Sequence, residues 1–183
     1  MNQTIDQTEV RKFPIEGTNL DKILHDPQHR QAFHAQLKQY NPIIVALYRM
    51  GLLPLFGVSR TVMLLTTKGN KSGKLRSTPI GYFRIGGILH LFSAWGRGTG
   101  WYKNIVAYPN DIWIQIGLRR FPVYVEELKE PAEIQRILEQ FVAEFPAQAK
   151  VLFGWDPGHD RMECADFSEV IQRVLIVRFI ENV

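Results

Sequence analysis

The stretch TTKGNKSGKLRSTP, residues 66 to 79, connects two apolar runs and decides how the rest of the sequence is interpreted. Its glycines, Gly69 and Gly73, allow the tight turn that joins two antiparallel strands. It also carries four cations, Lys68, Lys71, Lys74 and Arg76. A glycine-bearing turn exposes backbone N–H groups, and cations beside it add positive potential. We therefore expect this hairpin to bind an anion.

The charge distribution along the chain supports this expectation. Residues 27 to 110 contain 11 Lys and Arg and no Asp or Glu, which leaves 11 cations and all 18 acids in the other 99 residues. A block of one sign is typical of a surface that meets an anionic ligand. The alternative is a solvated surface, but such a surface normally carries both signs.

Length and composition predict a globular protein of 183 residues, with 45% hydrophobic and 22% charged residues. We expect one domain, in which residues 1 to 58 form a tail and helices and residues 59 to 183 form a barrel with further helices. The only cysteine, Cys164, cannot form an internal disulfide, and no metal-ligand spacing accompanies it. The polar N-terminus does not resemble a signal peptide, so we expect a cytoplasmic protein.

One apolar segment, residues 42 to 58, raises the question of a membrane. It is too short to span a bilayer and contains Arg49 and Pro54. We expect it to pack on the domain's own core, with peripheral contact to a membrane through the N-terminal helices as the alternative.

The coarse pattern predicts an antiparallel sheet. Helices are expected to begin at Asp26-Pro27, Asn41-Pro42, Gly100 and Pro131. Strands are expected over residues 61–67, 75–84, 88–93, 112–117, 121–126 and 174–180. Because hairpins join most of these strands and helices lie at both ends, the fold class is α+β with an antiparallel sheet or small barrel.

The other motifs in the sequence do not define a binding or catalytic site. The run GRGTG, residues 96 to 100, has the wrong spacing for a dinucleotide fingerprint. No combination of nucleophile, base and orienting residue can be assembled, so no catalytic side chain is predicted. Chemistry would then come from a bound redox cofactor. The aromatic residues belong to strand and helix patterns, and we expect no nucleic-acid partner.

A longer run carries a resemblance to a known family. LLTTKGNKSGKLRSTPIGYFRIGG (64–87), followed by SAWG (93–96) and WYKNIVAYPN (101–110), is similar to the deazaflavin-dependent nitroreductase family, and LYRMGLLPLFG (47–57) matches as well. The likeness covers about residues 47 to 117. It implies a split β-barrel of the FMN-binding type and the deazaflavin coenzyme F420, which carries a phosphate and a glutamate tail.

The resemblance also implies which residues bind the cofactor. The hairpin residues would hold the phosphate and acidic tail, the end of the third predicted strand would border the deazaflavin ring, and the helix after it would close the pocket. These residues are Lys71, Ser72, Arg76, Thr78, Pro79, Ser93, Ala94, Trp95, Gly96, Trp101, Tyr102 and Asn104.

The implied activity is hydride transfer from reduced F420 to a hydrophobic, electron-poor acceptor, namely a quinone, enone or nitro compound. Nitro-reducing members have tyrosines in a C-terminal segment where this chain has Phe167 and no tyrosine. The alternatives are FMN as the cofactor, or a non-catalytic barrel that binds a fatty acid, haem or FMN. A homodimer is expected by analogy.

Overall fold

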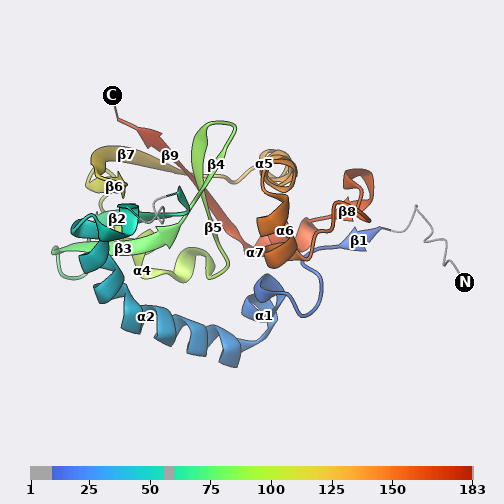
Figure 1. Ribbon diagram of the computed structural model, residues 1–183, viewed down its shortest axis with the longest axis horizontal. Helices are drawn as coiled ribbons and strands as arrows, with labels where there is room; N and C mark the ends of the chain where they lie inside the picture. The colour runs from blue at the N-terminus through green and yellow to red at the C-terminus, as the bar shows by residue number, and fades with distance from the viewer. Residues whose placement is uncertain (1–9, 56–59, 183) are drawn as a thin grey trace, which may run out of the picture.

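A seven-stranded antiparallel sheet organises the computed structural model, which describes residues 10–55 and 60–182 (Figure 1). The strand order is β3-β2-β6-β7-β9-β5-β4. The strands are β2 (Val62–Lys68), β3 (Leu75–Gly81), β4 (Phe83–Ile85), β5 (Ile88–Ser93), β6 (Ile112–Ile116), β7 (Arg119–Glu127) and β9 (Leu175–Glu181). Every neighbouring pair is antiparallel.

The sheet curls because its two edge strands are consecutive in the chain. β3 and β4 are separated only by Tyr82, whose N–H donates to the carbonyl of Thr61 at 3.0 Å, beside β2. The next residue, Phe83, already pairs with His90 of β5 at the other edge. One extended segment therefore belongs to both edges, which closes the sheet into a barrel. The predicted α+β antiparallel barrel is confirmed.

Seven α-helices accompany the sheet in the described residues. They are α1 (Asn19–His25), α2 (Pro27–Arg49), α3 (Leu52–Leu55), α4 (Gly100–Ala107), α5 (Pro131–Glu144), α6 (Pro146–Phe153) and α7 (Ser168–Arg173). Short 3-10 turns occur at η2 (Gly96–Gly98) and η3 (Met162–Cys164), and β1 (Arg11–Lys12) pairs in parallel with β8 (Ala165–Asp166). None of these helices is long and apolar enough to cross a membrane.

Two hydrophobic cores hold these elements together. The first fills the barrel with strand residues such as Met63, Leu65 and Ile114, and Ile105 of α4 packs against them. The second lies outside the barrel, where the apolar stripe of α5, including Leu138 and Phe141, packs with α1, α6 and α7. The helix expected to begin at Pro131 is confirmed, and its apolar stripe belongs to the core.

The N-terminal helices differ from the prediction. Two helices were expected, with the second beginning at Asn41-Pro42, but α2 runs without interruption from Pro27 to Arg49 and contains Pro42. Pro42 cannot donate to the carbonyl of Lys38. Residues 31 to 40 are all exposed, so water can solvate that carbonyl. Of the apolar segment 42–58, residues 56 to 58 lie outside the described residues.

Both ends of α2 are fixed. At the N-terminus, Asp26 Oδ1 accepts from the N–H groups of Gln28 and His29 at 2.9 and 3.0 Å, as its predicted capping role requires. At the C-terminal end, the fully buried Tyr48 lies with its hydroxyl 3.1 Å from the Val62 carbonyl and accepts from Gly117 N–H at 3.1 Å. The middle of the helix is thereby held in place although its residues are exposed.

Candidate functional site

The β2–β3 hairpin forms its turn mainly with its own backbone. Gly69 N–H donates to the Lys74 carbonyl at 2.9 Å, and the N–H groups of Ser72 and Gly73 donate to the Gly69 carbonyl at 3.2 and 2.8 Å. The expectation that this turn offers its backbone N–H groups to an anion is therefore wrong for these three residues. Most contacts to an anion would therefore come from side chains.

The hairpin is positioned by the buried Asn104 of α4. Its Oδ1 accepts from Asn70 N–H at 2.9 Å, and its Nδ2 donates to Thr67 Oγ1 at 3.0 Å. One side chain thus connects α4 both to the turn and to the end of β2. This places Asn104 behind the hairpin, where it fixes the position of the cationic residues.

Ser72 and Arg76 come together above Gly69. Arg76 Nη2 lies 3.5 Å from Ser72 Oγ. A Cβ atom at position 69 would lie 2.8 Å from Ser72 Oγ and 3.2 Å from Arg76 Nε, so only glycine leaves room for this arrangement. Lys71 is exposed on the same turn, next to Ser72.

The charges of this turn are not balanced by carboxylates. Lys71, Lys74 and Arg76 form no ion pair with any described residue, whereas Lys68 lies 3.8 Å from Asp111 and 4.7 Å from the centre of the Tyr108 ring. A cluster of unpaired cations produces a positive potential that favours a phosphate or carboxylate ligand.

The middle of β3 links the hairpin to α2. Thr78 and Pro79 are half-buried and pair with Leu65 and Leu64 of β2. One residue earlier, Ser77 Oγ lies 2.9 Å from Thr66 Oγ1 and accepts from Arg49 Nη2 of α2 at 2.8 Å. The sequence prediction did not select Arg49, although it belongs to the basic block and to the LYRMG match.

The segment Ser93 to Gly96 ends β5 and lies under the N-terminal half of α2. Ser93 is buried and pairs with Leu175 of β9. The Trp95 ring stacks on Phe33 of α2, with 5.8 Å between ring centres and planes 8° apart. A cavity of about 340 Å³ beside it is lined by Pro27, Arg30, Gln31, His34 and Trp95.

Two donors near this cavity have no partner among the described residues. Trp95 Nε1 and Arg30 Nε are both buried, and neither makes a hydrogen bond there. A buried donor without an acceptor costs about 1–3 kcal/mol. An acceptor oxygen from a ligand would remove this cost.

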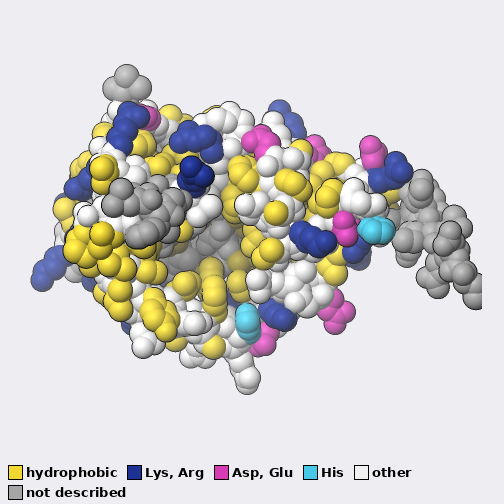
Figure 2. Space-filling model, in the orientation of Figure 1, with side chains coloured by type: hydrophobic (Ala, Val, Ile, Leu, Met, Phe, Trp, Pro, Cys, Tyr) yellow, Lys and Arg dark blue, Asp and Glu magenta, His cyan; other side chains and the backbone are white. Residues whose placement is uncertain are grey.

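The side of α2 that carries Phe33 continues as an apolar stripe. Leu37 and Tyr40 follow at helical spacing, and all three side chains are more than a third exposed. Figure 2 shows hydrophobic side chains along this helix. The stripe therefore provides an apolar wall beside the Trp95 segment.

On α4, Trp101 and Tyr102 are half-buried against the barrel core. The Tyr102 hydroxyl donates to Glu127 of β7, and Arg97 forms an ion pair with the same carboxylate. Burial alone raises the pKa of Glu127, but these two donors outweigh it and the pKa lies below its ordinary value. Burial and the neighbouring Glu127 raise the pKa of Tyr102, so this tyrosine stays neutral and holds α4 against β7.

The predicted residues thus form three groups around α2. The hairpin group is cationic, the Trp95 group is aromatic, and the α4 group supports both through Asn104 and Tyr102. Helix α2 contacts β3, and α4 contacts β2. The described part of the chain contains no cluster of three or more His, Cys, Asp or Glu that could hold a metal ion. This arrangement can bind an anionic group and a flat apolar group, and it offers no nucleophile with an adjacent base.

Comparison with known proteins identifies the family. The family model described as F420H(2)-dependent quinone reductase matches residues 53 to 152, more than half of the chain. The chain belongs to this family. The F420H2-dependent quinone reductase family uses F420 as its cofactor, which confirms the cofactor and the deazaflavin resemblance inferred from the sequence. No curated protein matches the sequence significantly.

Several solved structures are similar to this member of the family. An F420-H2 dependent reductase, FDR-A, has 24% identity, covers 67% of this chain and 95% of its own, and gives a TM-score of 0.44. A putative pyridoxamine 5′-phosphate oxidase from Listeria innocua has 12% identity, covers 70% of this chain and 91% of its own, and gives a TM-score of 0.43. A FAD-binding protein from Mesorhizobium loti has 15% identity, covers 72% of this chain and 89% of its own, and gives a TM-score of 0.43.

The residues of the hairpin fit the cofactor that this family uses. The phosphate and glutamate tail of F420 are anionic, and Lys71, Lys74 and Arg76 are cations without carboxylate partners in the described chain. The absence of a side chain at Gly69 keeps Ser72 Oγ and Arg76 Nε close together. The chemistry of this donor set therefore suits an anionic group such as a phosphate or carboxylate.

Proposed function

We propose that this protein reduces a hydrophobic, electron-poor acceptor with F420H2, and that the acceptor is a quinone. The observation that carries the proposal is the group of cations on the β2–β3 hairpin that have no carboxylate partner among the described residues, in a chain that belongs to an F420H2-dependent family. F420H2, when bound, supplies a hydride to the acceptor. The residues of the chain bind both molecules, orient them and exclude water.

In this proposal the hairpin holds the anionic part of the cofactor. Lys71 and Arg76 contribute charge, and Ser72 contributes a hydroxyl beside Arg76. Asn104 acts as a positioning residue, because its amide holds Asn70 and Thr67. Thr78, Pro79 and the segment from Ser93 to Gly96 would border the flat part of the cofactor.

The acceptor would lie in the cavity lined by Arg30 and Trp95, beside the stacked pair of Phe33 and Trp95. The apolar stripe of Phe33, Leu37 and Tyr40 suits the body of a quinone. The unpartnered N–H groups of Trp95 and Arg30 suit its carbonyl oxygen, because a carbonyl accepts hydrogen bonds. No side chain is assigned as the proton donor to the reduced acceptor.

Titration with F420, followed by its fluorescence, tests the cofactor site. We expect Lys71→Ala and Arg76→Ala each to weaken binding about tenfold or more, because a hydrogen bond to a charged group is worth about 1.5–3 kcal/mol. Lys12→Ala is the matched control, since Lys12 is an exposed cation of β1, which lies far from β2 and β3 in Figure 1.

Turnover of menadione with F420H2 then tests the activity. The proposal predicts quinone reduction by the native protein and a higher KM for F420H2 in the two hairpin variants. Unchanged F420 affinity in both variants would reject the hairpin as the phosphate site. Tight F420 binding without turnover of any quinone would indicate a binding protein without reductase activity. Preferential binding of FMN over F420 would identify FMN as the cofactor.

A further inference from the structure

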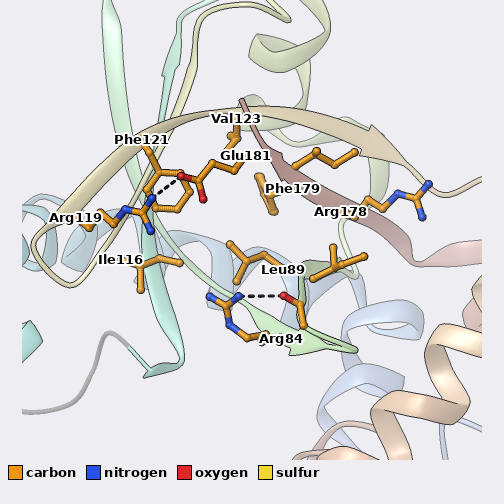
Figure 3. Close-up of a pocket in the computed structure, with 12 residues that line it drawn as sticks. Arg84, Leu89, Ile116, Arg119, Phe121, Val123, Arg178, Phe179 and Glu181 are labelled. Atoms are coloured by element: carbon orange, nitrogen blue, oxygen red, sulfur yellow. Dashed lines mark hydrogen bonds and ion pairs between the residues drawn. The ribbon is translucent and has the colours of Figure 1, made fainter. Parts of the chain in front are cut away.

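A second cavity lies at the other end of the barrel. Its lining includes Ile116 at the end of β6 and Leu89 near the start of β5 (Figure 3). In the β2–β6 ladder, Thr67 pairs with Ile112 and Leu64 pairs with Gln115, so Ile116 lies toward the start of β2. The cationic hairpin follows the end of β2. The two sites are therefore separated along the strands.

The wall of this cavity is apolar and comes from four strands. It consists of Leu89 (β5), Ile116 (β6), Phe121 and Val123 (β7) and Phe179 (β9). The cavity volume is about 550 Å³, which is within the usual range for small-molecule sites of about 300–1,000 Å³. This space suits a ligand with a compact hydrophobic body.

Three arginines stand around this wall, and their charges are compensated to different degrees. Arg178 pairs with Glu126 and Glu133, both at 2.8 Å, and its guanidinium points away from the other two in Figure 3. Arg119 pairs with Glu181 at 2.5 Å. Arg84 donates only to the Gly87 carbonyl, at 3.0 Å, and has no carboxylate partner in the described chain. Arg84 is therefore the cation available to a ligand.

We propose that this cavity binds a small amphipathic carboxylate, with its apolar body on the strand wall and its carboxylate between Arg84 and Arg119. Glu181 already places a carboxylate on Arg119 at the rim of the cavity. A ligand carboxylate reproduces that contact and adds the unpaired Arg84. Arg84 has no carboxylate partner in the described chain, and Arg119 is shared with Glu181, so the positive charge at the rim matches a monoanion better than a dianionic phosphate.

Binding of 2-naphthoate, followed by its fluorescence, tests this site. We expect Arg84→Gln to weaken binding about tenfold, equivalent to about 1.4 kcal/mol, because the unpaired charge is lost. Glu181→Gln should strengthen binding, since it releases Arg119. Arg120→Gln is the control: its guanidinium lies over the Trp113 ring, 5.6 Å from the ring centre, and it does not line the cavity.

Three results would overturn the proposal. The first is an Arg84→Gln protein that binds naphthoate as well as the native protein does. The second is equal affinity for 2-naphthalenemethanol, which has the same body without the charge. The third is loss of naphthoate binding in Arg76→Ala, which would place the probe in the cofactor site instead. Because the first two readouts do not involve F420, they are independent of the proposed reductase activity.

Discussion

At the scale of single residues, His90 combines burial with an incomplete set of hydrogen bonds. Its side chain lies in the middle of β5 and is 1% exposed. Nδ1 lies 3.1 Å from the Ile88 carbonyl and therefore carries the proton of the neutral ring, while Nε2 has no partner in the described chain. Burial lowers the pKa of His90 below its ordinary value of 6.5.

This makes stability depend on pH in a defined direction. Between the lowered pKa and about 6.5, the unfolded chain binds more protons than the folded one, so the free energy of unfolding falls as the pH falls through this window. We expect His90→Phe to lose less stability than the native protein when the pH is lowered from about 7.5 to about 5.5. Urea denaturation at both pH values measures the difference. Equal losses in the two proteins would show that folding does not lower the pKa of His90.

A second residue illustrates what sequence patterns miss. Asn104 was assigned to the cofactor pocket by resemblance, and the sequence did not indicate that its amide bonds to Asn70 and Thr67. Likewise, the turn around Gly69 was expected to offer backbone N–H groups that are in fact used within the turn. A sequence indicates which residue types gather in a region, but hydrogen-bond partners depend on how α4 and the hairpin meet in three dimensions.

At the scale of elements, local signals predicted most of the strands and the helices α4 and α5 well, whereas α6 was not predicted. The strand expected over residues 88–93 has these bounds in the structure, and the helix expected to begin at Gly100 does begin there. The strand expected over 75–84 divides at Tyr82, because the chain passes there from one edge of the barrel to the other. That transition depends on sheet closure, which has no local signal.

Helix α2 provides a test of an element that was predicted wrongly. An interior proline destabilises a helix by roughly 3 kcal/mol, but it also stabilises the folded protein by about 1 kcal/mol because it restricts the unfolded chain. We expect Pro42→Ala to raise the free energy of unfolding by about 1–2 kcal/mol, since alanine restores the missing N–H donor. Chemical denaturation measures this change.

The matched control is Pro27→Ala. Pro27 occupies the first position of the same helix, where proline is favourable, so this variant should gain no stability. A destabilised Pro42→Ala protein would mean that the ring of Pro42 makes packing contacts that outweigh the lost hydrogen bond.

At the scale of the whole molecule, the closed barrel explains why the second cavity was not predicted. Arg84, Arg119 and Phe179 are far apart in the sequence and meet only because β4, β7 and β9 belong to one curled sheet. The basic block was visible in the sequence, since a run of 84 residues without an acid needs no structure to be recognised. The single domain and the homodimer remain predictions.

The same charge distribution predicts how F420 approaches the protein. Residues 27 to 110 supply 11 cations and no acid, and they include α2, the hairpin and α4, around which the proposed cofactor site is built. A positive region of this kind attracts a multiply charged anion before contact, and salt shortens the reach of that attraction from about 30 Å at 0.01 M to about 10 Å at 0.1 M.

We therefore expect the association rate constant for F420 to fall about tenfold over this range of ionic strength, whereas the dissociation rate constant changes less, since close contacts are screened weakly. Stopped-flow fluorescence measures both constants. A deazaflavin without phosphate or glutamate lacks the charges that the field acts on, so its association rate should vary little with salt. If F420 and the uncharged deazaflavin responded equally, the 11 cations would not guide the cofactor, and their clustering would need another anionic partner to explain it.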